Sequence, residues 1–352
     1  MRWAGSIVLA LSALILGASP STAVSADPVV TCRSSNPTCW PDAFAFTPTG
    51  RIVFVERFTG QIRMFNLATG KQRLWDRVGN VAGGGEKGVL GVAVHPRWKE
   101  ARRFHWVYVF YTNGTANENR IIRIRHRKDG TRVRELLVRI PAASNHNGGV
   151  IHFGPDARLY AVTGDAGNPA LAQSMNSRAG KILRMSPGGK AVSGNPFPGS
   201  RIFSFGHRNS FGFTFDPQTK VLWQTENGPT CDDEINRVPG GGNYGWGSGS
   251  NCPGTSEVGP SPIQPEWSFN NPVIAPTGAA FCRRCGLGVE GRLLLGSFND
   301  GKIRAATLDA ERDDITSVSI LYSHSRFVLA VERRSNGRVF FSDDRRIYRL
   351  EP

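Results

Sequence analysis

Short runs of alternating apolar and polar residues dominate the chain after its N-terminal segment. Val, Ile, Phe, Leu and Tyr recur at alternate positions within a run, and Gly, Pro, Asp and Asn separate the runs. This alternation is typical of antiparallel strands, because successive side chains of a strand point to opposite faces of the sheet. Sustained helical periodicity is absent beyond the N-terminal segment, so the pattern predicts an all-β fold.

The runs form a weakly repeated unit, in which two apolar strands flank a Pro, Asp or Gly turn and a third strand contains Ile-x-Arg or a similar triplet. Six such units follow one another, at residues 44–64, 92–124, 151–184, 213–238, 279–304 and 329–350. Units of roughly 50 to 60 residues with about four strands suit the blades of a β-propeller. A closed six-bladed β-propeller explains sequential, equivalent units better than a β-sandwich, and it allows residues 27–352 to form a single domain.

Residues 1–26 have the pattern of a secretory signal peptide. A positive charge at Arg2 precedes a short apolar run, and small residues follow that run. Cleavage after Ala26 is the preferred interpretation, and cleavage after Ala23 is the next. A membrane anchor is disfavoured because the apolar run is too short to span a bilayer. We therefore expect a secreted or periplasmic protein without a transmembrane anchor.

Six cysteines, an even number, suggest disulfide bonds in an exported chain. The pairs that close the smallest loops are Cys32–Cys39, Cys231–Cys252 and Cys282–Cys285. The Cys-x-x-Cys spacing of the last pair also occurs in zinc and redox sites. Zinc is disfavoured because a second such pair and a nearby His are missing, and a thioredoxin-type site because the βαβ context is missing. A structural disulfide is the favoured interpretation, although sequence alone leaves the connectivity open.

The chain is strongly basic, with 43 Lys and Arg against 28 Asp and Glu and a formal net charge of +15. One interpretation is binding to nucleic acid or another polyanion. The other is a basic exported protein with a cationic pocket for an anionic ligand. We favour the second, without nucleic acid as a partner, because the cations are spread along the sequence and no nucleic-acid-binding module is recognisable. Loose adsorption to acidic envelope polymers is compatible with it.

His146 lies in the polar loop 145–149, directly before an expected strand. An imidazole can act as a general base near neutral pH, although a lone loop histidine more often satisfies a turn. Asp165 changes this balance, because it begins the loop after the strand pair that follows His146. A hairpin returns the chain, so we expect both side chains on one face of the propeller. A carboxylate on one ring nitrogen fixes the tautomer and strengthens the other nitrogen as a base.

Two further loops carry polar groups with different chemistry. Arg208 and Asn209 offer a planar cation and an amide to carboxylate or carbonyl oxygens, and the alternative is a surface salt bridge. The acidic residues 232–234 follow Gly228 and Pro229. Carboxylate and main-chain carbonyl oxygens are the ligands that calcium prefers. A solvated acidic turn is less favoured, because these acids are concentrated in one turn of a very basic chain.

In their order, these motifs resemble the soluble glucose/sorbosone dehydrogenase family over nearly the whole mature chain. The resemblance is strongest in Gly88-Val-Leu-Gly-Val-Ala-Val-His-Pro, His146-Asn-Gly-Gly, Phe153-Gly-Pro-Asp with Gly164-Asp165, Gly180-Lys-Ile-Leu-Arg, Gly206-His-Arg-Asn, Asp233-Glu-Ile-Asn and Gly242-Asn-Tyr-Gly-Trp246. The family consists of exported six-bladed propellers that bind pyrroloquinoline quinone (PQQ) and calcium. The resemblance implies an enzyme that oxidises aldose sugars at C1 to lactones and passes hydride to the quinone.

The resemblance also implies roles for the residues of the polar loops. His146 would be the general base on the C1 hydroxyl, and Asp165 would orient it. Arg208 and Asn209 would contact PQQ oxygens, with Arg208 stabilising the charge that grows on the reducing quinone.

The resemblance implies two calcium sites. Main-chain carbonyls of Gly228 and Pro229 would hold the calcium that polarises PQQ. Glu234 and Tyr244 match ligands of a second, structural calcium.

The chain departs from the family pattern at three positions near the cofactor. Glu86 stands where the family usually has Gln, and Asn299 replaces an expected Lys. Of two expected arginines only Arg326 has a match, because Val328 occupies the other position. PQQ is a tricarboxylate, so the loss of two cations and the gain of an anion should weaken its binding. Each lost charge-assisted contact costs about 1.5–3 kcal/mol.

Cations elsewhere in the sequence, such as Lys87 or Arg284, are candidates to compensate for this loss. The departures also motivate an alternative function, a non-catalytic propeller that binds a saccharide or a protein partner, as in hedgehog-interacting-type relatives. Titration with PQQ discriminates the two hypotheses, because only the enzyme requires tight binding of the quinone. The sugar, the electron acceptor and the oligomeric state are not encoded in a recognisable motif.

Overall fold

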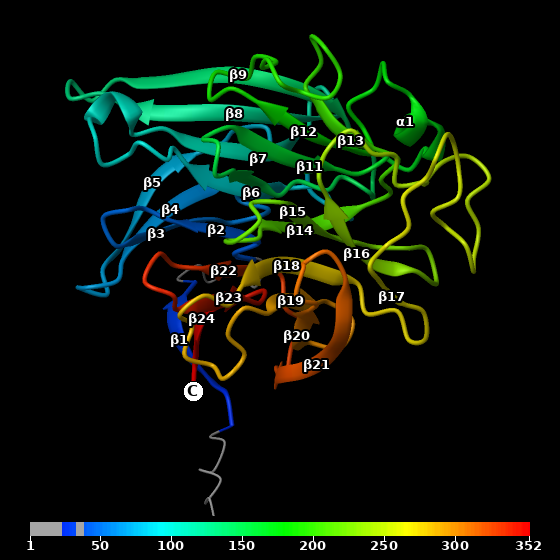
Figure 1. Cartoon of the computed structure of the whole chain (residues 1–352). Coiled ribbons are helices and arrows are strands. Elements are labelled where there is room, and N and C mark those ends of the chain that lie inside the picture. Colours follow the sequence, from blue (N-terminus) through cyan, green and yellow to red (C-terminus); the bar gives the residue numbers. More distant parts are fainter. Residues whose placement is uncertain (1–22, 33–38) are drawn as a thin grey trace, which may run out of the picture.

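The computed structural model describes residues 23–32 and 39–352, so most of the predicted signal peptide lies outside the described residues. Within them, 24 strands form six antiparallel sheets of four strands (Figure 1). Each sheet consists of strands that are consecutive in the sequence, except for the last one. This arrangement confirms the predicted six-bladed β-propeller, and we number the sheets as blades 1 to 6 in chain order.

The first three blades pair their strands in sequence order. Blade 1 contains β2 (Ala43–Phe46), β3 (Arg51–Val55), β4 (Gln61–Asn66) and β5 (Gln72–Arg77). Blade 2 contains β6 (Val89–Val94), β7 (Val107–Asn113), β8 (Glu118–His126) and β9 (Arg132–Pro141). Blade 3 contains β10 (Ile151–Phe153), β11 (Leu159–Thr163), β12 (Lys181–Met185) and β13 (Ile202–Phe205).

The next two blades follow the same order, and the sixth combines both ends of the described chain. Blade 4 contains β14 (Ser210–Phe215), β15 (Leu222–Glu226), β16 (Asp233–Val238) and β17 (Trp267–Phe269). Blade 5 contains β18 (Pro276–Phe281), β19 (Leu293–Ser297), β20 (Lys302–Leu308) and β21 (Ile315–Ser323). Blade 6 contains β22 (Val331–Arg333), β23 (Val339–Ser342), β24 (Arg346–Glu351) and β1 (Ser25–Thr31).

Strand β1 closes the ring, because it pairs with β24 and supplies the outer strand of blade 6. The pairing begins at Ser25 opposite Glu351 and continues with Ala26 opposite Leu350. The sequence pattern did not predict this strand. The preferred cleavage after Ala26 would remove the first two residues of β1, whereas cleavage after Ala23 would leave the strand whole.

Six apolar clusters fill the spaces between neighbouring blades, including the space between blade 6 and blade 1. Strand β7 shows how one strand serves two clusters. Val107 and Val109 pack toward blade 1, and the alternating Tyr108 and Phe110 pack toward blade 3. All four side chains are fully buried. Strands buried on both faces therefore hold the blades in a ring and fix where the connecting loops meet.

The structure contains the three predicted disulfides, Cys32–Cys39, Cys231–Cys252 and Cys282–Cys285. The last bond leaves no thiolate for zinc, although Glu290 lies close to both sulfur atoms. Helical structure in the described part is limited to α1 (Pro169–Gln173) and the 3-10 turn Arg102–Phe104. None of the described helices is long and apolar enough to cross a bilayer.

Candidate active site

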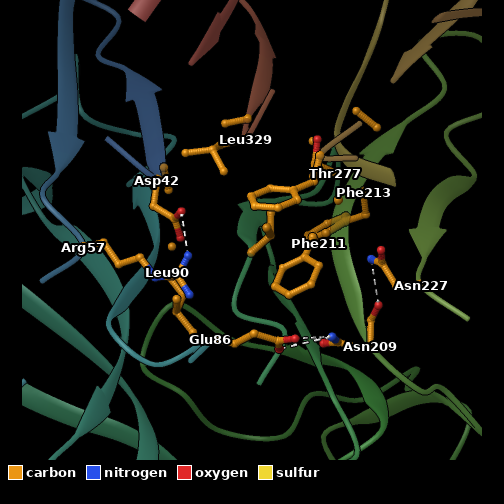
Figure 2. A pocket seen from close by; sticks show the side chains of 18 of the residues that line it. Asp42, Arg57, Glu86, Leu90, Asn209, Phe211, Phe213, Asn227, Thr277 and Leu329 are labelled. Carbon is orange, nitrogen blue, oxygen red and sulfur yellow. Dashed lines mark hydrogen bonds and ion pairs between the residues drawn. The ribbon is translucent and has the colours of Figure 1, made fainter. Parts of the chain in front are cut away.

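A cavity of about 400 Å³ lies on the propeller axis, and residues from all six blades line it. This volume is in the range of small-molecule sites. Figure 2 shows the Asp42–Arg57 pair on one side of the cavity and Asn209 with Asn227 on the other. Its walls are mainly apolar, with polar side chains at a small number of positions around the cavity. This composition favours a planar or partly apolar ligand that a small number of polar groups orient.

His146 lines this cavity, and Asp165 lies behind it, in contact with its imidazole. The Nδ1 atom of His146 lies 2.7 Å from Oδ1 of Asp165, and the carboxylate is fully buried. Asp165 also accepts hydrogen bonds from Trp246 Nε1 and from the Gly167 main chain, each at 2.7 Å. A buried carboxylate held by this many donors remains an acceptor and fixes the imidazole ring. Nε2 of His146 is then the nitrogen that can exchange a proton with a ligand.

Local backbone geometry forces this pair together. His146 has a φ of 54°, in the left-handed region that is uncommon for residues other than glycine. Gly164 allows the two loops to touch, because a Cβ there would lie 2.1 Å from the carbonyl oxygen of His146. The main-chain N–H of Asp165 donates to the carbonyl of Arg208 at 2.8 Å. The base, its carboxylate and the arginine loop therefore form one connected unit.

Arg208 lies beside this unit with part of its guanidinium available. Its Nη1 donates to the Asn227 carbonyl at 2.8 Å, and the guanidinium lies 5.2 Å from the centre of the Trp246 ring. Its Nε is buried and has no hydrogen-bond partner among the described residues. Burial lowers the pKa of Arg208, while Asp165 and other nearby carboxylates act in the opposite direction. A buried donor without an acceptor is costly, so this atom favours a ligand oxygen in the cavity.

Asn209 and Glu86 form the second polar group of the cavity. Both carboxylate oxygens of Glu86 lie 3.2 Å from Nδ2 of Asn209, and one also accepts from the main-chain N–H of Asn147 at 3.3 Å. Oδ1 of Asn209 accepts from the Gly148 main chain at 3.3 Å. Glu86 therefore holds the Asn209 amide, and it places a carboxylate on the wall of the cavity.

Arg57 is a second cation in the wall, one that the sequence analysis did not identify. It donates to Asp42 at 3.3 Å and to the carbonyls of Lys87 and Gly85 at 3.1 and 3.2 Å. Its guanidinium lies 5.3 Å from the centre of the Phe58 ring. Asp42 compensates much of this charge, although burial raises the pKa of that carboxyl against the effect of Arg57.

A small cavity of about 10 Å³ adjoins the Arg208 loop. Three buried carboxylates, those of Glu226, Asp232 and Glu234, line it together with two hydroxyl groups. Burial and repulsion from Glu226 and Asp232 raise the pKa of Glu234 to about 8. The volume suits one water molecule or one ion. Clustered carboxylate and hydroxyl oxygens fit a hard cation such as calcium, which would relieve the repulsion.

The other residues that the resemblance assigns to metal binding are Tyr244, Gly228 and Pro229, and they differ in their position relative to the two cavities. Tyr244 lines the small cavity, but its hydroxyl donates to the Arg237 carbonyl at 2.7 Å, so its main chain is the group left for a metal. Gly228 lines both cavities, and a Cβ there would lie 1.8 Å from the Cys231 carbonyl. Only glycine fits that turn. Pro229 is exposed and lines neither cavity in the described structure.

Several residues that the resemblance places near the cofactor lie outside the lining of the central cavity. Arg326 forms an ion pair with Asp344, and it does not belong to the described lining. Asn299 donates to the Val273 carbonyl, and Val328 is buried in an apolar cluster. The described lining also lacks the two candidate compensating cations, Lys87 and Arg284.

Sequence reasoning missed two residues that hold the polar groups in place. Trp246 fixes Asp165 from 81 positions away. Glu226 accepts from the Arg208 main chain and lies 2.8 Å from Nδ1 of His207. Trp246 belonged to a quoted motif, but a tryptophan in a loop carries no signal of its partner. The hydrogen-bonded pair His207–Glu226 is buried, which spacing along the sequence does not reveal.

Comparison with known proteins identifies the family of this chain. The family described as Glucose / Sorbosone dehydrogenase matches residues 39–350. The chain belongs to this family. It is 32% identical to quinoprotein glucose dehydrogenase B of Acinetobacter calcoaceticus over 241 residues, which are 58% of this chain and 50% of that protein. It is 29% identical to aldose sugar dehydrogenase YliI of Escherichia coli over 217 residues, which are 58% of each protein.

The family assignment extends to solved structures. The PQQ-bound aldose sugar dehydrogenase of Streptomyces coelicolor is 29% identical, with a TM-score of 0.78 over 95% of this chain and 99% of that one. The named relatives are glucose and aldose sugar dehydrogenases, so family membership supports an oxidoreductase that acts on sugars. The aligned regions span about half the length of the two named curated relatives.

Proposed function

We propose that this protein is an exported, PQQ- and calcium-dependent dehydrogenase that oxidises aldose sugars at C1 to lactones. The observation that carries the proposal is the buried Asp165 carboxylate on Nδ1 of His146, directly beside Arg208 at the end of a cavity on the propeller axis. Family membership supports the sugar-oxidising activity. The PQQ bound to the Streptomyces coelicolor relative supports the choice of cofactor.

Removal of the C1 proton is the role of His146. Nε2 accepts the proton of the C1 hydroxyl while C1 loses a hydride, so the carbon is oxidised by two electrons. PQQ, when bound, supplies the quinone that takes up this hydride. Asp165 is a positioning residue, because it touches the imidazole and stabilises the cation that forms on the ring. Trp246 holds Asp165 in turn through its 2.7 Å hydrogen bond.

Arg208 and Asn209 are the residues that would hold the oxygens of PQQ. The unpaired Nε of Arg208 needs an acceptor, and Arg208 also stabilises negative charge that develops in the cavity. Trp40, Phe58 and Phe298 supply aromatic walls that suit a planar ring system. Glu86 places a carboxylate in the same wall, so we expect PQQ to bind more weakly than it would to the same cavity without this charge.

Calcium is proposed at two places next to the loop between β15 and β16. Gly228 is available to the central cavity through its main-chain carbonyl, and Glu234 with Tyr244 borders the small carboxylate-lined cavity. A bound ion there would hold the loop that carries the Arg208 and Asn227 contacts. Calcium is therefore expected to stabilise the fold as well as the cofactor site.

The three disulfides support export, because disulfides are typical of proteins in oxidising compartments. The predicted signal peptide falls mainly on residues outside the described structure. We propose a secreted or periplasmic location.

The decisive experiment is titration of the purified protein with PQQ in the presence of calcium, followed by addition of aldoses. The proposal expects saturable binding, a spectral change on sugar addition and dye reduction. It further expects His146→Ala and Asp165→Asn to lower kcat by about 10²- to 10⁴-fold, since the first removes the general base and the second removes the carboxylate that orients it, while PQQ binding is left intact. Chelation of calcium should lower both the melting temperature and activity, and readdition should restore them.

A non-catalytic propeller is the second candidate, because Arg326 is paired outside the central cavity and Glu86 places an anion in it. Absence of PQQ binding with calcium present would favour this candidate. PQQ binding with unchanged activity in His146→Ala would instead refute the proposed base while keeping the cofactor.

A further inference from the structure

A second solvent-facing cavity, of about 530 Å³, lies between blades 2 and 3. It is formed by the connection from β6 to β7, by β8, by the turn between β10 and β11, and by Pro187. Its lining contains no Asp or Glu among the described residues, but it contains five arginines: Arg97, Arg103, Arg123, Arg125 and Arg158. We call it the arginine cavity.

The arginine cavity lies at the opposite end of the blades from the candidate active site. Strand β6 begins next to Glu86 of the central cavity and ends at His95 of the arginine cavity. Six strand residues at about 3.3 Å each separate the two ends by roughly 20 Å. In Figure 1 the cyan turn between β6 and β7 lies at the left end of blade 2, whereas α1, which follows Asp165, lies at the right.

The positive charge of this cavity is only partly compensated. Arg97 pairs with Glu100, and Arg123 pairs with Glu135. Three lining arginines have no ion pair with any described carboxylate: Arg103, Arg125 and Arg158. Nε of Arg125 is also buried without a hydrogen-bond partner in the described structure. Three uncompensated charges, one of them with an unpartnered N–H donor, favour a negatively charged acceptor.

Aromatic rings hold the guanidinium groups in place. Arg123 and Arg125 lie 4.3 and 4.5 Å from the centre of the Trp106 ring. Arg97 and Arg103 lie 4.1 and 4.8 Å from the centre of the Phe104 ring. A stacked guanidinium keeps its in-plane N–H groups free for oxygen ligands. Ordering these side chains before a ligand arrives reduces the entropy lost on binding.

Main-chain contacts tie the same arginines to neighbouring elements. Nη1 of Arg123 donates to the Pro187 carbonyl at 2.9 Å, which links blade 2 to blade 3. Nη1 of Arg125 donates to the Arg103 carbonyl at 2.8 Å, which links β8 to the turn after β6. The cavity is therefore assembled from distant parts of the sequence, and its arginines are not a run of independent surface charges.

His95 lines the same cavity, and its pKa is lowered mainly by burial. Burial, with smaller contributions from Arg97 and Arg123, lowers the pKa of His95 to about 4. Its Nδ1 accepts from the main-chain N–H of Arg97 at 3.1 Å, which leaves the imidazole neutral with its proton on Nε2. An anion in the cavity would oppose the two arginines and raise this pKa.

We propose that the arginine cavity binds a multivalent oxyanion, a small molecule with two or more phosphate or carboxylate groups. Arg103, Arg125 and Arg158 supply the uncompensated charge and the free N–H donors. Planar guanidinium groups pair with either oxyanion through two parallel hydrogen bonds. The site is separate from the sugar-oxidising site and does not depend on the proposed cofactor.

The test is isothermal titration calorimetry of the full protein at low ionic strength with inorganic triphosphate and, separately, with citrate. We expect saturable binding at one site, and the tighter of the two probes identifies phosphate or carboxylate as the preferred group. Arg103→Glu combined with Arg158→Glu should weaken binding at least tenfold, because each lost charge-assisted hydrogen bond corresponds to about a tenfold change or more. Dehydrogenase activity of this variant should be unchanged.

A matched control is Arg127→Glu combined with Lys128→Glu, which changes the net charge equally at exposed positions outside the cavity. The control should weaken binding by less than about twofold. A second readout is the His95 titration by NMR, whose pKa should rise when triphosphate is bound. Non-saturable binding of both probes, or equal weakening in the two variants, would overturn the proposal and indicate adsorption by net charge alone.

Discussion

Glu86 is the residue at which this chain departs most clearly from a site for an anionic cofactor. Its carboxylate lies on the wall of the central cavity and is held there by Asn209 and Asn147. Of the two cations in the same wall, Arg57 is paired with Asp42, whereas Arg208 keeps a free donor. The balance of charge near the proposed cofactor is therefore set by a small number of side chains.

Glu86→Gln should tighten PQQ binding by about tenfold or more. Glutamine keeps an oxygen to accept from Asn209, and it removes a negative charge that repels the carboxylates of the quinone. A tenfold change in affinity corresponds to about 1.4 kcal/mol. The measurement is the dissociation constant from fluorescence or calorimetric titration of apo-protein with PQQ.

The control is Glu311→Gln, which removes an exposed carboxylate outside the central cavity and should leave affinity unchanged. Weaker binding in Glu86→Gln than in the wild-type protein would mean that the carboxylate supports the cofactor through Asn209. That outcome would refute the repulsion argument.

At the scale of elements, the sequence predicted the inner strands of each blade better than the outer ones. Inner strands such as β11 and β19 are buried along their whole length and consist mainly of apolar residues, so they appear as apolar runs. The outer strand β21 is mostly exposed, and the outer strand β17 contains three residues. Such strands resemble loops in a hydropathy pattern. Strand β1 was missed because its partner lies at the other end of the chain.

At the candidate site, too, the sequence predicted local contacts and missed those between distant parts of the chain. His146 and Asp165 are joined by one hairpin, so their proximity followed from local structure and the structure shows it. Contacts between residues of different blades had no such signal in the sequence. Arg57 reaches the cavity from blade 1, and Trp246 reaches Asp165 from the long connection between β16 and β17. Packing of neighbouring blades brings these residues together, and residue spacing along the chain does not encode it.

The closing strand leads to a prediction about the mature N-terminus. Val24 and Ala26 pack against the cluster that contains Tyr348 and Leu350, and Ser25 begins the pairing with β24. A protein that starts at Val24 should be more stable than one that starts at Asp27 by on the order of 1–2 kcal/mol, because two strand pairs and their apolar contacts are kept.

Equilibrium unfolding in urea of the two purified forms measures this difference. Mass spectrometry of the exported protein should correspondingly find Val24 as its first residue. Equal stability of the two forms would show that the first residues of β1 contribute nothing, and it would return cleavage after Ala26 to first place.

At the scale of the whole molecule, one side-chain contact spans the propeller axis. His152 lies on β10 of blade 3, and Glu332 lies on β22 of blade 6, on opposite sides of the ring. Nε2 of His152 lies 3.2 Å from a carboxylate oxygen of Glu332. Both residues line the central cavity and also another cavity, separate from the arginine cavity, that continues toward the other end of the blades. This pair therefore narrows the axial space behind the proposed active site.

Burial lowers the pKa of His152 to about 4, and it raises the pKa of Glu332 well above its ordinary value. Both effects favour the neutral form of each group. An unfolded chain would protonate His152 below its ordinary pKa of about 6.5, whereas the folded protein resists protonation until about pH 4. The unfolded state then binds more protons in this window, so His152 makes stability fall as the pH decreases from about 6.5 to about 4.

His152→Asn should therefore reduce the loss of stability between pH 7 and pH 5 by on the order of 1–2 kcal/mol, even if the variant is less stable than the wild-type protein at pH 7. Urea unfolding at the two pH values measures both changes. The quantity compared between variant and wild type is the change in the free energy of unfolding from pH 7 to pH 5. A loss of packing that is equal at both pH values therefore cancels. An unchanged dependence on pH would show that water in the axial cavity already solvates the imidazolium, and that the contact across the axis does not keep His152 neutral.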